Sequence, residues 1–213
     1  MKIGKRQFDM KNHGYIMGIL NVTPDSFSDG GRYTRLDAAL KHAEQMLGEG
    51  ADIIDVGGES TRPGHEKITV DEEIERTAPV IEALKREFDP VISLDTYKWQ
   101  VAEEGIRAGA DMINDIWGLK WDGKMAPLLA REGLPACLMH NRKNTDYKNF
   151  LSDVIKDLRE TMQTAGEAGM RKEQILLDPG IGFAKTLEQN LMLMNHLELL
   201  LEFQVPVLLG TSR

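Results

Sequence analysis

The sequence repeats one unit along its length, and this repetition restricts the possible folds more than any other feature. In each unit a short apolar run ends at a polar residue, often beside glycine or proline, and a segment with helical spacing of apolar residues follows. Residues 52–58 show the pattern most clearly. Ile53, Ile54 and Val56 have the β-branched bias of a strand buried on both faces, and a Gly-Gly pair ends that strand. Strands that alternate with helices predict parallel β/α units and an α/β fold.

The repeats predict the positions of the strands and helices. Strands are expected over residues 15–20, 53–56, 91–94, 112–113, 136–139, 175–177 and 205–209. Helices are expected over residues 34–49, 70–88, 101–106, 125–129, 151–165 and 187–201. Residues 2–13 are polar and mixed, and no linker-like change of composition divides the chain. We therefore predict a single domain over residues 1–213.

Two α/β architectures fit this pattern, an open doubly wound sheet and a closed barrel. An open sheet gathers its ligand groups at one switch point, whereas a barrel gathers them from the carboxyl ends of many strands. Polar residues close most of the expected strands, namely Asn21, Asp55, Asp95, Asn114, His140 and Asp178. In a barrel all of these residues face one mouth, so we favour a TIM-type (β/α)8 barrel.

Composition restricts the partners. The chain has 34 acidic and 26 basic residues, a net charge of −8, and no run of Lys or Arg, which disfavours nucleic acid and membrane surfaces as partners. An anionic small-molecule substrate stays open, because arginines, backbone N–H groups or a metal ion can reverse the sign inside one cleft. The one cysteine, Cys137, lies in an apolar run, which favours a reduced thiol and a cytoplasmic location. No stretch reaches the roughly 18 apolar residues of a membrane span.

Three strand-end residues, Asp95, Asn114 and Asp178, are our candidates for binding a flat nitrogen heterocycle. Carboxylates accept hydrogen bonds from ring N–H and amino groups, while an asparagine side chain both donates and accepts. An aminopyrimidinone ring suits such a set. The alternative for each residue is a helix N-cap, since each one precedes a helix or turn. Asp55 is ambiguous, because a carboxylate there can simply order the Gly-Gly turn.

Longer motifs resemble the dihydropteroate synthases of folate biosynthesis. Residues 21–31 (NVTPDSFSDGG) resemble the first signature loop of that family, and residues 57–64 (GGESTRPG) resemble the second signature loop. Shorter stretches are similar to the family's pterin-pocket motifs, namely 93–96 (SLDT), 114–116 (NDI), 178–183 (DPGIGF) and the start of another at 210–213 (GTSR). The two loop signatures are long and specific, and the resemblance covers nearly the whole chain.

The resemblance implies a (β/α)8 barrel that joins 6-hydroxymethyl-7,8-dihydropterin diphosphate to 4-aminobenzoate and releases diphosphate. Asp95 and Asp178 are then expected to stabilise the electron-poor pterin methylene, and Asn114 to bind the pterin edge. Met139 is expected to line the face of the pterin ring. The alternative for Met139 is a plain core residue.

The resemblance also implies groups for the leaving diphosphate and for 4-aminobenzoate. Thr61 and the catalytic Arg62, with Mg²⁺ held near Asn21, are expected to neutralise the diphosphate. Pro63 and Phe183 are expected to contact the 4-aminobenzoate ring. The alternatives are a loop cap without a metal for Asn21 and a packing role under a helix start for Phe183.

The sequence departs from the family pattern at its carboxyl end. The family normally continues beyond this point with Lys and Ser, a further helix, an eighth strand bearing Arg and His, and a closing helix. The resemblance therefore implies a barrel truncated after strand seven and incomplete at the C-terminus, with a homodimer expected for the complete-length protein. A smaller departure is Ala184, where the family usually has Gly.

Two rival functions fit parts of the sequence. A pterin-binding methyltransferase of the corrinoid type resembles the same barrel and pocket, but the Ser-Thr-Arg-Pro segment of the second signature loop suits a diphosphate leaving group that methyl transfer lacks. A non-catalytic remnant that binds pterin or nothing is the other alternative. A binding titration set beside a turnover assay separates these possibilities.

Overall fold

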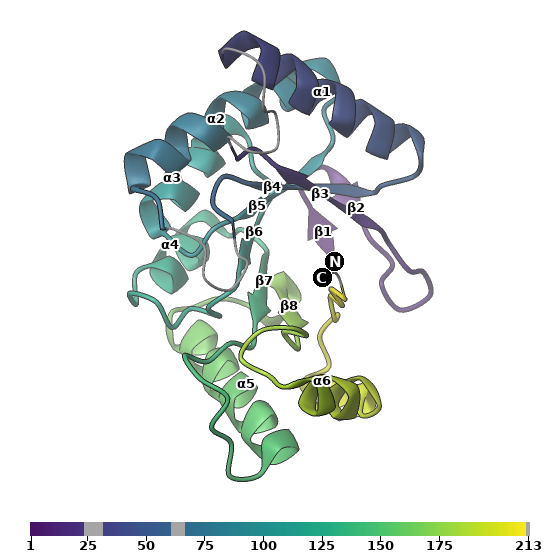
Figure 1. Ribbon diagram of the computed structural model, residues 1–213, viewed down its shortest axis with the longest axis vertical. Helices are drawn as coiled ribbons and strands as arrows, with labels where there is room; N and C mark the ends of the chain where they lie inside the picture. The colour runs from purple at the N-terminus through teal and green to yellow at the C-terminus, as the bar shows by residue number, and fades with distance from the viewer. Residues whose placement is uncertain (24–31, 61–66, 212–213) are drawn as a thin grey trace. The chain divides into compact units, whose positions relative to one another are not determined.

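The computed structural model describes residues 1–23, 32–60 and 67–211, in two compact units that consist of residues 1–114 and 115–213 (Figure 1). The loop residues 24–31 and 61–66, which include Thr61, Arg62 and Pro63, lie outside the described residues. No helix in the described ranges is long and apolar enough to cross a membrane.

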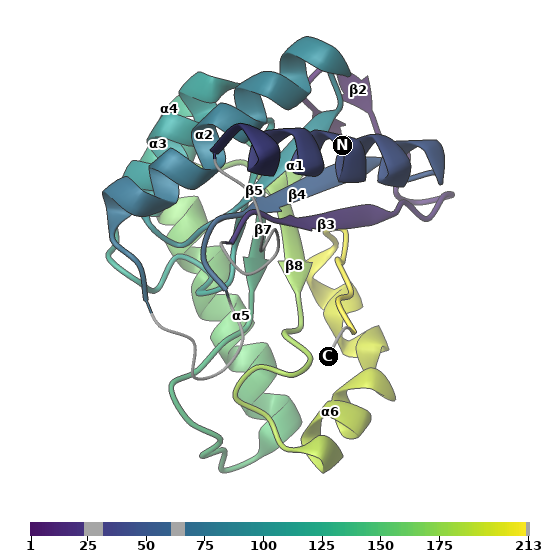
Figure 2. The ribbon, with the colours of Figure 1, turned by 45° about the horizontal axis from the view of Figure 1, so that its top comes forward.

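The first unit is built on parallel strands β3 (Met17–Asn21), β4 (Ile53–Gly57), β5 (Val91–Asp95) and β6 (Met112–Asp115), paired in that order. Helices α1 (Arg32–Gly48), α2 (Val70–Glu87) and α3 (Trp99–Ala108) connect the strands and lie side by side along them (Figure 2). Every residue of β4 is buried, as the apolar Ile53, Ile54 and Val56 predict, and the burial includes the carboxyl group of Asp55. Helix α2 begins where the Thr69 side chain accepts a hydrogen bond from Glu72 N at 3.2 Å.

A short antiparallel hairpin precedes the parallel strands, and the sequence patterns did not predict it. Strands β1 (Lys2–Ile3) and β2 (Arg6–Gln7) form it, and Ile3 and Phe8 are buried although the segment as a whole is polar. Gly4 turns the hairpin with φ 56°, and a Cβ there would lie 2.3 Å from Asp111 Oδ1. The hairpin thus needs glycine at this turn for two reasons, a left-handed backbone and a close side chain.

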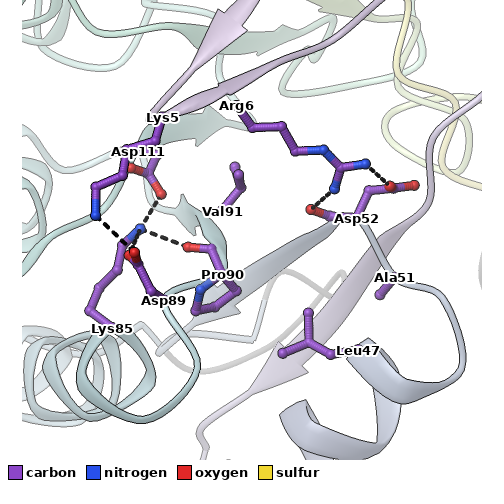
Figure 3. Close-up of a pocket in the computed structure, with 10 residues that line it drawn as sticks. All are labelled: Lys5, Arg6, Leu47, Ala51, Asp52, Lys85, Asp89, Pro90, Val91 and Asp111. Atoms are coloured by element: carbon purple, nitrogen blue, oxygen red, sulfur yellow. Dashed lines mark hydrogen bonds and ion pairs between the residues drawn. The ribbon is translucent and has the colours of Figure 1, made fainter.

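A cleft lies between this hairpin and the amino ends of the strands (Figure 3). Its charged side chains form three ion pairs with nitrogen to oxygen distances of 2.5–2.8 Å, namely Lys85 with Asp111, Arg6 with Asp52, and Lys5 with Asp89. Asp111 Oδ2 also accepts from the backbone N–H of Ile92 at 2.9 Å. The pairs of Arg6 and Lys5 connect the hairpin to the residues just before β4 and β5, and the contacts of Asp111 connect the residue before β6 to α2 and β5. All of them lie at the end opposite to the strand-end candidates, so we assign the cleft a structural role.

The second unit continues the alternation of strands and helices. Helix α4 (Met125–Glu132) leads to β7 (Ala136–Met139), and α5 (Phe150–Glu167) leads through a 3₁₀ turn, η2 (Lys172–Gln174), to β8 (Ile175–Asp178). Strands β7 and β8 are parallel and buried along their whole length. Helix α6 (Leu187–Met194) and the 3₁₀ segment η3 (Leu197–Phe203) follow.

Two elements of the second unit differ from the sequence prediction. The single helix expected over 187–201 is divided, since α6 ends at Met194 and a 3₁₀ segment begins at Leu197. The strand expected over 205–209 is reduced to one parallel bridge, between Leu177 and Val207. Pro206 explains part of this difference, because it accepts a hydrogen bond from Leu177 N but has no N–H to donate to a ladder. The prediction of a single domain stays a prediction.

Candidate active site

The pairing of the first unit puts its strand-end candidates in one row. Asn21 pairs with Gly57, Gly57 with Asp95, and Asp95 with Asn114. A Cβ at Gly57 would lie 3.5 Å from Asn21 Oδ1 and 3.5 Å from Asp95 Oδ2, so these two oxygens flank the glycine. Asn21 is exposed, while Asp95 and Asn114 are half-buried, and all three remain within reach of a ligand.

The helix-cap alternative is wrong for Asp95, Asn114 and Asp178. The helices that follow them begin several residues later, with N-caps at Lys98, Lys124 and Thr186. Asp178 does order a turn, since its Oδ1 accepts from the backbone N–H of Gly180 at 2.7 Å. Binding of a ligand is therefore the alternative that stays open for the three side chains.

Asp55 lies in the middle of β4 and not at the strand end where the sequence pattern placed it, because β4 continues to Gly57. It is buried, and its Oδ2 accepts a hydrogen bond from Asn114 Nδ2 at 3.1 Å. Among the described residues, Asp55 Oδ1 has no hydrogen-bond partner. Burial raises the pKa of Asp55, and the nearby Ser93 hydroxyl and Asn114 amide oppose that shift. Asp55 thus binds Asn114 and does not order the Gly-Gly turn, which was the role that the sequence suggested. Because the contact uses the amide nitrogen of Asn114, the amide oxygen can accept a hydrogen bond from a ligand.

A buried charged cluster lies beside the same strand ends, and the sequence analysis missed it. Lys98 Nζ lies 2.6 Å from both Glu59 Oε2 and Glu73 Oε2. The same ammonium donates to Ile68 O at 2.9 Å, and Glu59 Oε2 accepts from Ile68 N at 3.2 Å. Burial opposes the charged form of Lys98, but hydrogen bonds to Glu59 and Glu73 outweigh it and raise the pKa of the lysine. The cluster thereby fixes the residues on both sides of the segment 61–66.

In the second unit, Asp178 ends β8 as a buried carboxylate. Burial raises its pKa to about 6, against the opposing effects of the Gly180 N–H and the charge of Lys185. Lys185 is itself buried, and its ammonium donates to Gly180 O at 2.7 Å and to Phe183 O at 2.9 Å. Burial lowers the pKa of Lys185 to about 7, and the carboxylate of Asp178 opposes this shift.

Met139 ends β7, and His140 follows it directly. Met139 is buried, which fits both a pterin face and the core alternative, and Phe183 is half-buried in the turn after β8. His140 Nε2 lies 3.0 Å from Asp157 Oδ2, and burial lowers the pKa of His140 to about 4, so its ring is neutral near pH 7. Burial opposes the charge of Asp157, but hydrogen bonds from His140 and Arg142 outweigh it and lower the pKa of that carboxyl.

No single signal in the sequence would have identified Lys98, Asp157 or Lys185. An acidic residue in the middle of a helix usually faces solvent, and a lysine just after a loop motif usually does so too. Each of the three is buried because of partners 17 to 39 residues away or because of carbonyls in its own turn. His140 was identified only as a strand end.

A metal site is not evident from acidic and histidine side chains alone. Within the described ranges no group of three or more His, Cys, Asp or Glu side chains could hold an ion. Mg²⁺, however, often takes only one or two protein oxygens and completes its shell with water and phosphate oxygens. The exposed Asn21 oxygen and the neighbouring Asp95 oxygen fit such a partial set.

Comparison with known proteins gives consistent matches. A family model described as pterin binding enzyme matches residues 17–213. Dihydropteroate synthase of Clostridium beijerinckii is 57% identical over 213 residues, which are 100% of this chain and 79% of that protein. The crystal structure of dihydropteroate synthase from Clostridium difficile with pteroic acid has a TM-score of 0.94 and 49% identity, over 97% of this chain and 79% of that one. The Xanthomonas albilineans enzyme with 4-aminobenzoic acid has a TM-score of 0.89 and 42% identity, over 94% and 74%. These structural matches confirm the predicted α/β barrel fold class.

Proposed function

The chain belongs to the pterin-binding enzymes and, within them, to the dihydropteroate synthases, and from this premise we propose how its residues serve the reaction. The enzyme is a transferase that condenses 6-hydroxymethyl-7,8-dihydropterin diphosphate with 4-aminobenzoate to give 7,8-dihydropteroate and diphosphate in folate biosynthesis. The relatives named above favour the synthase over the rival enzyme, because both the Clostridium beijerinckii protein and the compared crystal structures are dihydropteroate synthases. The observation that carries the residue assignments is the row of Asn21, Asp95 and Asn114 at neighbouring strand ends.

Asp95 and Asn114 bind the pterin. The carboxylate of Asp95 accepts from ring N–H or amino groups, and the Asn114 oxygen does the same while its nitrogen is held by Asp55. In the second unit Asp178 is a second carboxylate acceptor for the pterin, and Met139 provides an apolar face. The 4-aminobenzoate ring packs on Phe183 and Pro63.

Asp95 and Asp178 also act in the chemical step. The C–O bond between the pterin methylene and the diphosphate breaks, and its electron pair leaves with the diphosphate. The methylene that remains is electron-poor, and the two carboxylates stabilise its positive charge together with the pterin ring nitrogens. The amine of 4-aminobenzoate then forms the C–N bond and loses a proton.

Arg62 and Thr61 bind the leaving diphosphate, with Arg62 neutralising charge as it develops. When bound, Mg²⁺ supplies further positive charge to the phosphate oxygens. Asn21 would hold it, with Asp95 as the neighbouring oxygen; the exposure of Asn21 and the position of the two side-chain oxygens on either side of Gly57 support this assignment.

A binding experiment tests the pterin assignments. Asp95→Ala and Asn114→Ala should each weaken binding of the pterin diphosphate by about 1.5–3 kcal/mol, because each loses buried or charge-assisted hydrogen bonds. Isothermal titration calorimetry measures the affinity. Asp52→Ala is the matched control, since Asp52 precedes β4 at the opposite end of the strands and pairs with Arg6. Unchanged affinity in both test variants would show that neither side chain contacts the pterin.

The magnesium assignment has its own test. Asn21→Ala should lower turnover and weaken its dependence on Mg²⁺ concentration, while the affinity for a pterin without diphosphate stays at the parent value. Turnover measured across a magnesium titration gives the first quantity, and calorimetry gives the second. A variant with the parent's magnesium dependence would refute the role of Asn21.

The remaining partners are proposed from the family and the composition. The substrates are small molecules, and the net charge of −8 without a basic run supports the absence of nucleic-acid and membrane partners. A cytoplasmic homodimer is expected, and a chain with one cysteine, the buried Cys137, which cannot form an internal disulfide, supports the reducing compartment. Sedimentation velocity of the purified protein tests the dimer.

A further inference from the structure

Side-chain donors bind three backbone carbonyls in and directly after the turn that follows β8. Gly180 O and Phe183 O both accept from Lys185 Nζ, and Ala184 O accepts from Tyr147 Oη at 3.0 Å. The turn itself closes through a hydrogen bond from Phe183 N to Gly180 O at 3.2 Å. Lys185 therefore binds the backbone carbonyls at both ends of this turn.

The backbone of the turn has little room to shift. Gly180 has φ 70°, and a Cβ there would lie 2.0 Å from the backbone oxygen of His140 and 3.1 Å from Lys185 Nζ. Gly182 N donates to Asn190 Oδ1 at 2.8 Å, which fixes the turn from the side of α6. Gly180 N donates to Asp178 Oδ1, so the same turn orients that carboxylate.

Lys185 is a lysine at a buried position, where charged side chains are rare. Its side chain forms no ion pair at hydrogen-bond distance within the described ranges, and its acceptors are backbone carbonyls. A buried ammonium without a paired carboxylate is costly, and an apolar side chain of similar length would avoid that cost. Its two carbonyl contacts give the lysine a specific task that an apolar residue cannot perform.

We propose that Lys185 is a positioning residue of the synthase reaction, which fixes Phe183 for 4-aminobenzoate and Asp178 for the pterin by holding the turn between them. This inference rests on the proposed function, since it takes both substrate contacts from there. Lys185 touches neither substrate and acts through the backbone of residues 180–183.

The charge of Lys185 also affects the pKa of Asp178, and this effect can be measured separately from any loss of stability. The charged or titratable groups that act on Lys185 are Asp178 of β8, Asp157 of α5, and Arg142 and His140 after β7. Lys185 lowers the pKa of Asp178 against the larger, raising effect of burial. Removing the ammonium should therefore raise the pKa of Asp178, so the carboxylate is lost at a higher pH than in the parent.

The test compares Lys185→Met with Lys120→Met. Lys120 is the matched control, because its ammonium donates to a backbone carbonyl of the same unit, Asp157 O at 3.2 Å, and has no part in the turn. In Lys185→Met we expect the KM for 4-aminobenzoate to rise about tenfold. The acidic limb of the pH profile of kcat/KM should also move to higher pH. Lys120→Met should keep the parent's KM and the parent's acidic limb.

A folded Lys185→Met enzyme with the parent's KM and acidic limb would overturn the inference. If that variant does not fold, Tyr147→Phe replaces it in the test, because this substitution removes only the hydrogen bond to the Ala184 carbonyl. A raised KM for 4-aminobenzoate in Tyr147→Phe supports the anchored turn. An unchanged KM overturns it. A parent protein without turnover would count against the proposed function instead. In that case, hydrogen exchange of the backbone amides at 180–184 tests whether Lys185 holds the turn without an assay of activity. We expect faster exchange in Lys185→Met than in Lys120→Met.

Discussion

At the scale of single residues, Ala184 has a backbone conformation that favours glycine. Its φ is 47°, in the left-handed region, where a Cβ costs roughly 1–2 kcal/mol. Glycine avoids this cost because it has no Cβ. We expect Ala184→Gly to raise the free energy of unfolding by about 1 kcal/mol after the entropy cost of glycine, which corresponds to a rise of about 2–4 °C in Tm.

The neighbouring Gly182 supplies the matched control for this prediction. It has φ 87° and no atom within 4 Å of the place where a Cβ would be, so substitution changes only the backbone energy. Gly182→Ala should lower the free energy of unfolding by about 1–2 kcal/mol. Thermal unfolding followed by circular dichroism measures both changes, and shifts of the same sign in the two variants would contradict this explanation.

The raised pKa of Asp178 leads us to expect a specific pH dependence of the reaction. Burial raises its pKa to about 6, so the carboxylate is present above that pH and is lost as the pH falls through it. If the charged form binds the pterin, kcat/KM should fall below about pH 6. Asp178→Asn should lower kcat/KM at neutral pH and remove this acidic limb. A variant that keeps the parent's limb would assign it to another group.

At the scale of elements, the cluster of Lys98, Glu59 and Glu73 connects the end of β4, the start of α2 and the start of α3. Lys98→Met leaves two buried carboxylates without their cation, so we expect it to lower the free energy of unfolding by about 3–5 kcal/mol. Lys85→Met, which breaks the more exposed pair with Asp111 at the opposite end of the strands, should cost less. Urea unfolding of the two variants compares these costs, and an equal or larger loss in Lys85→Met would contradict the assigned importance of the cluster.

The elements that the sequence predicted well are those with long, regular apolar patterns. Strands β4, β5, β7 and β8 and helices α1, α2 and α5 lie where periodicity indicated them. The hairpin of β1 and β2 was missed because each strand has only two residues, too few for any period. The division after Met194 was missed because its apolar residues continue at helical spacing into the 3₁₀ segment.

At the scale of the whole molecule, the fold class and the family could be predicted from sequence, whereas the supporting contacts of the candidate site could not. Asp95 and Asn114 follow from topology, since parallel strands bring their carboxyl ends into one row. The contacts of Lys98 and Lys185 depend on which buried side chains meet after folding. The periodicity of apolar residues in the sequence carries no information on these side-chain contacts, which only the structure shows.

The proposed function requires that this chain catalyse the condensation of a pterin diphosphate with 4-aminobenzoate. Release of diphosphate by the purified protein, followed with and without 4-aminobenzoate in the presence of Mg²⁺, tests it most directly. We predict release that requires both substrates and yields 7,8-dihydropteroate in equal amount, and that falls sharply in Asp95→Ala. A folded protein that binds the pterin diphosphate but shows no 4-aminobenzoate-dependent release would contradict the claim.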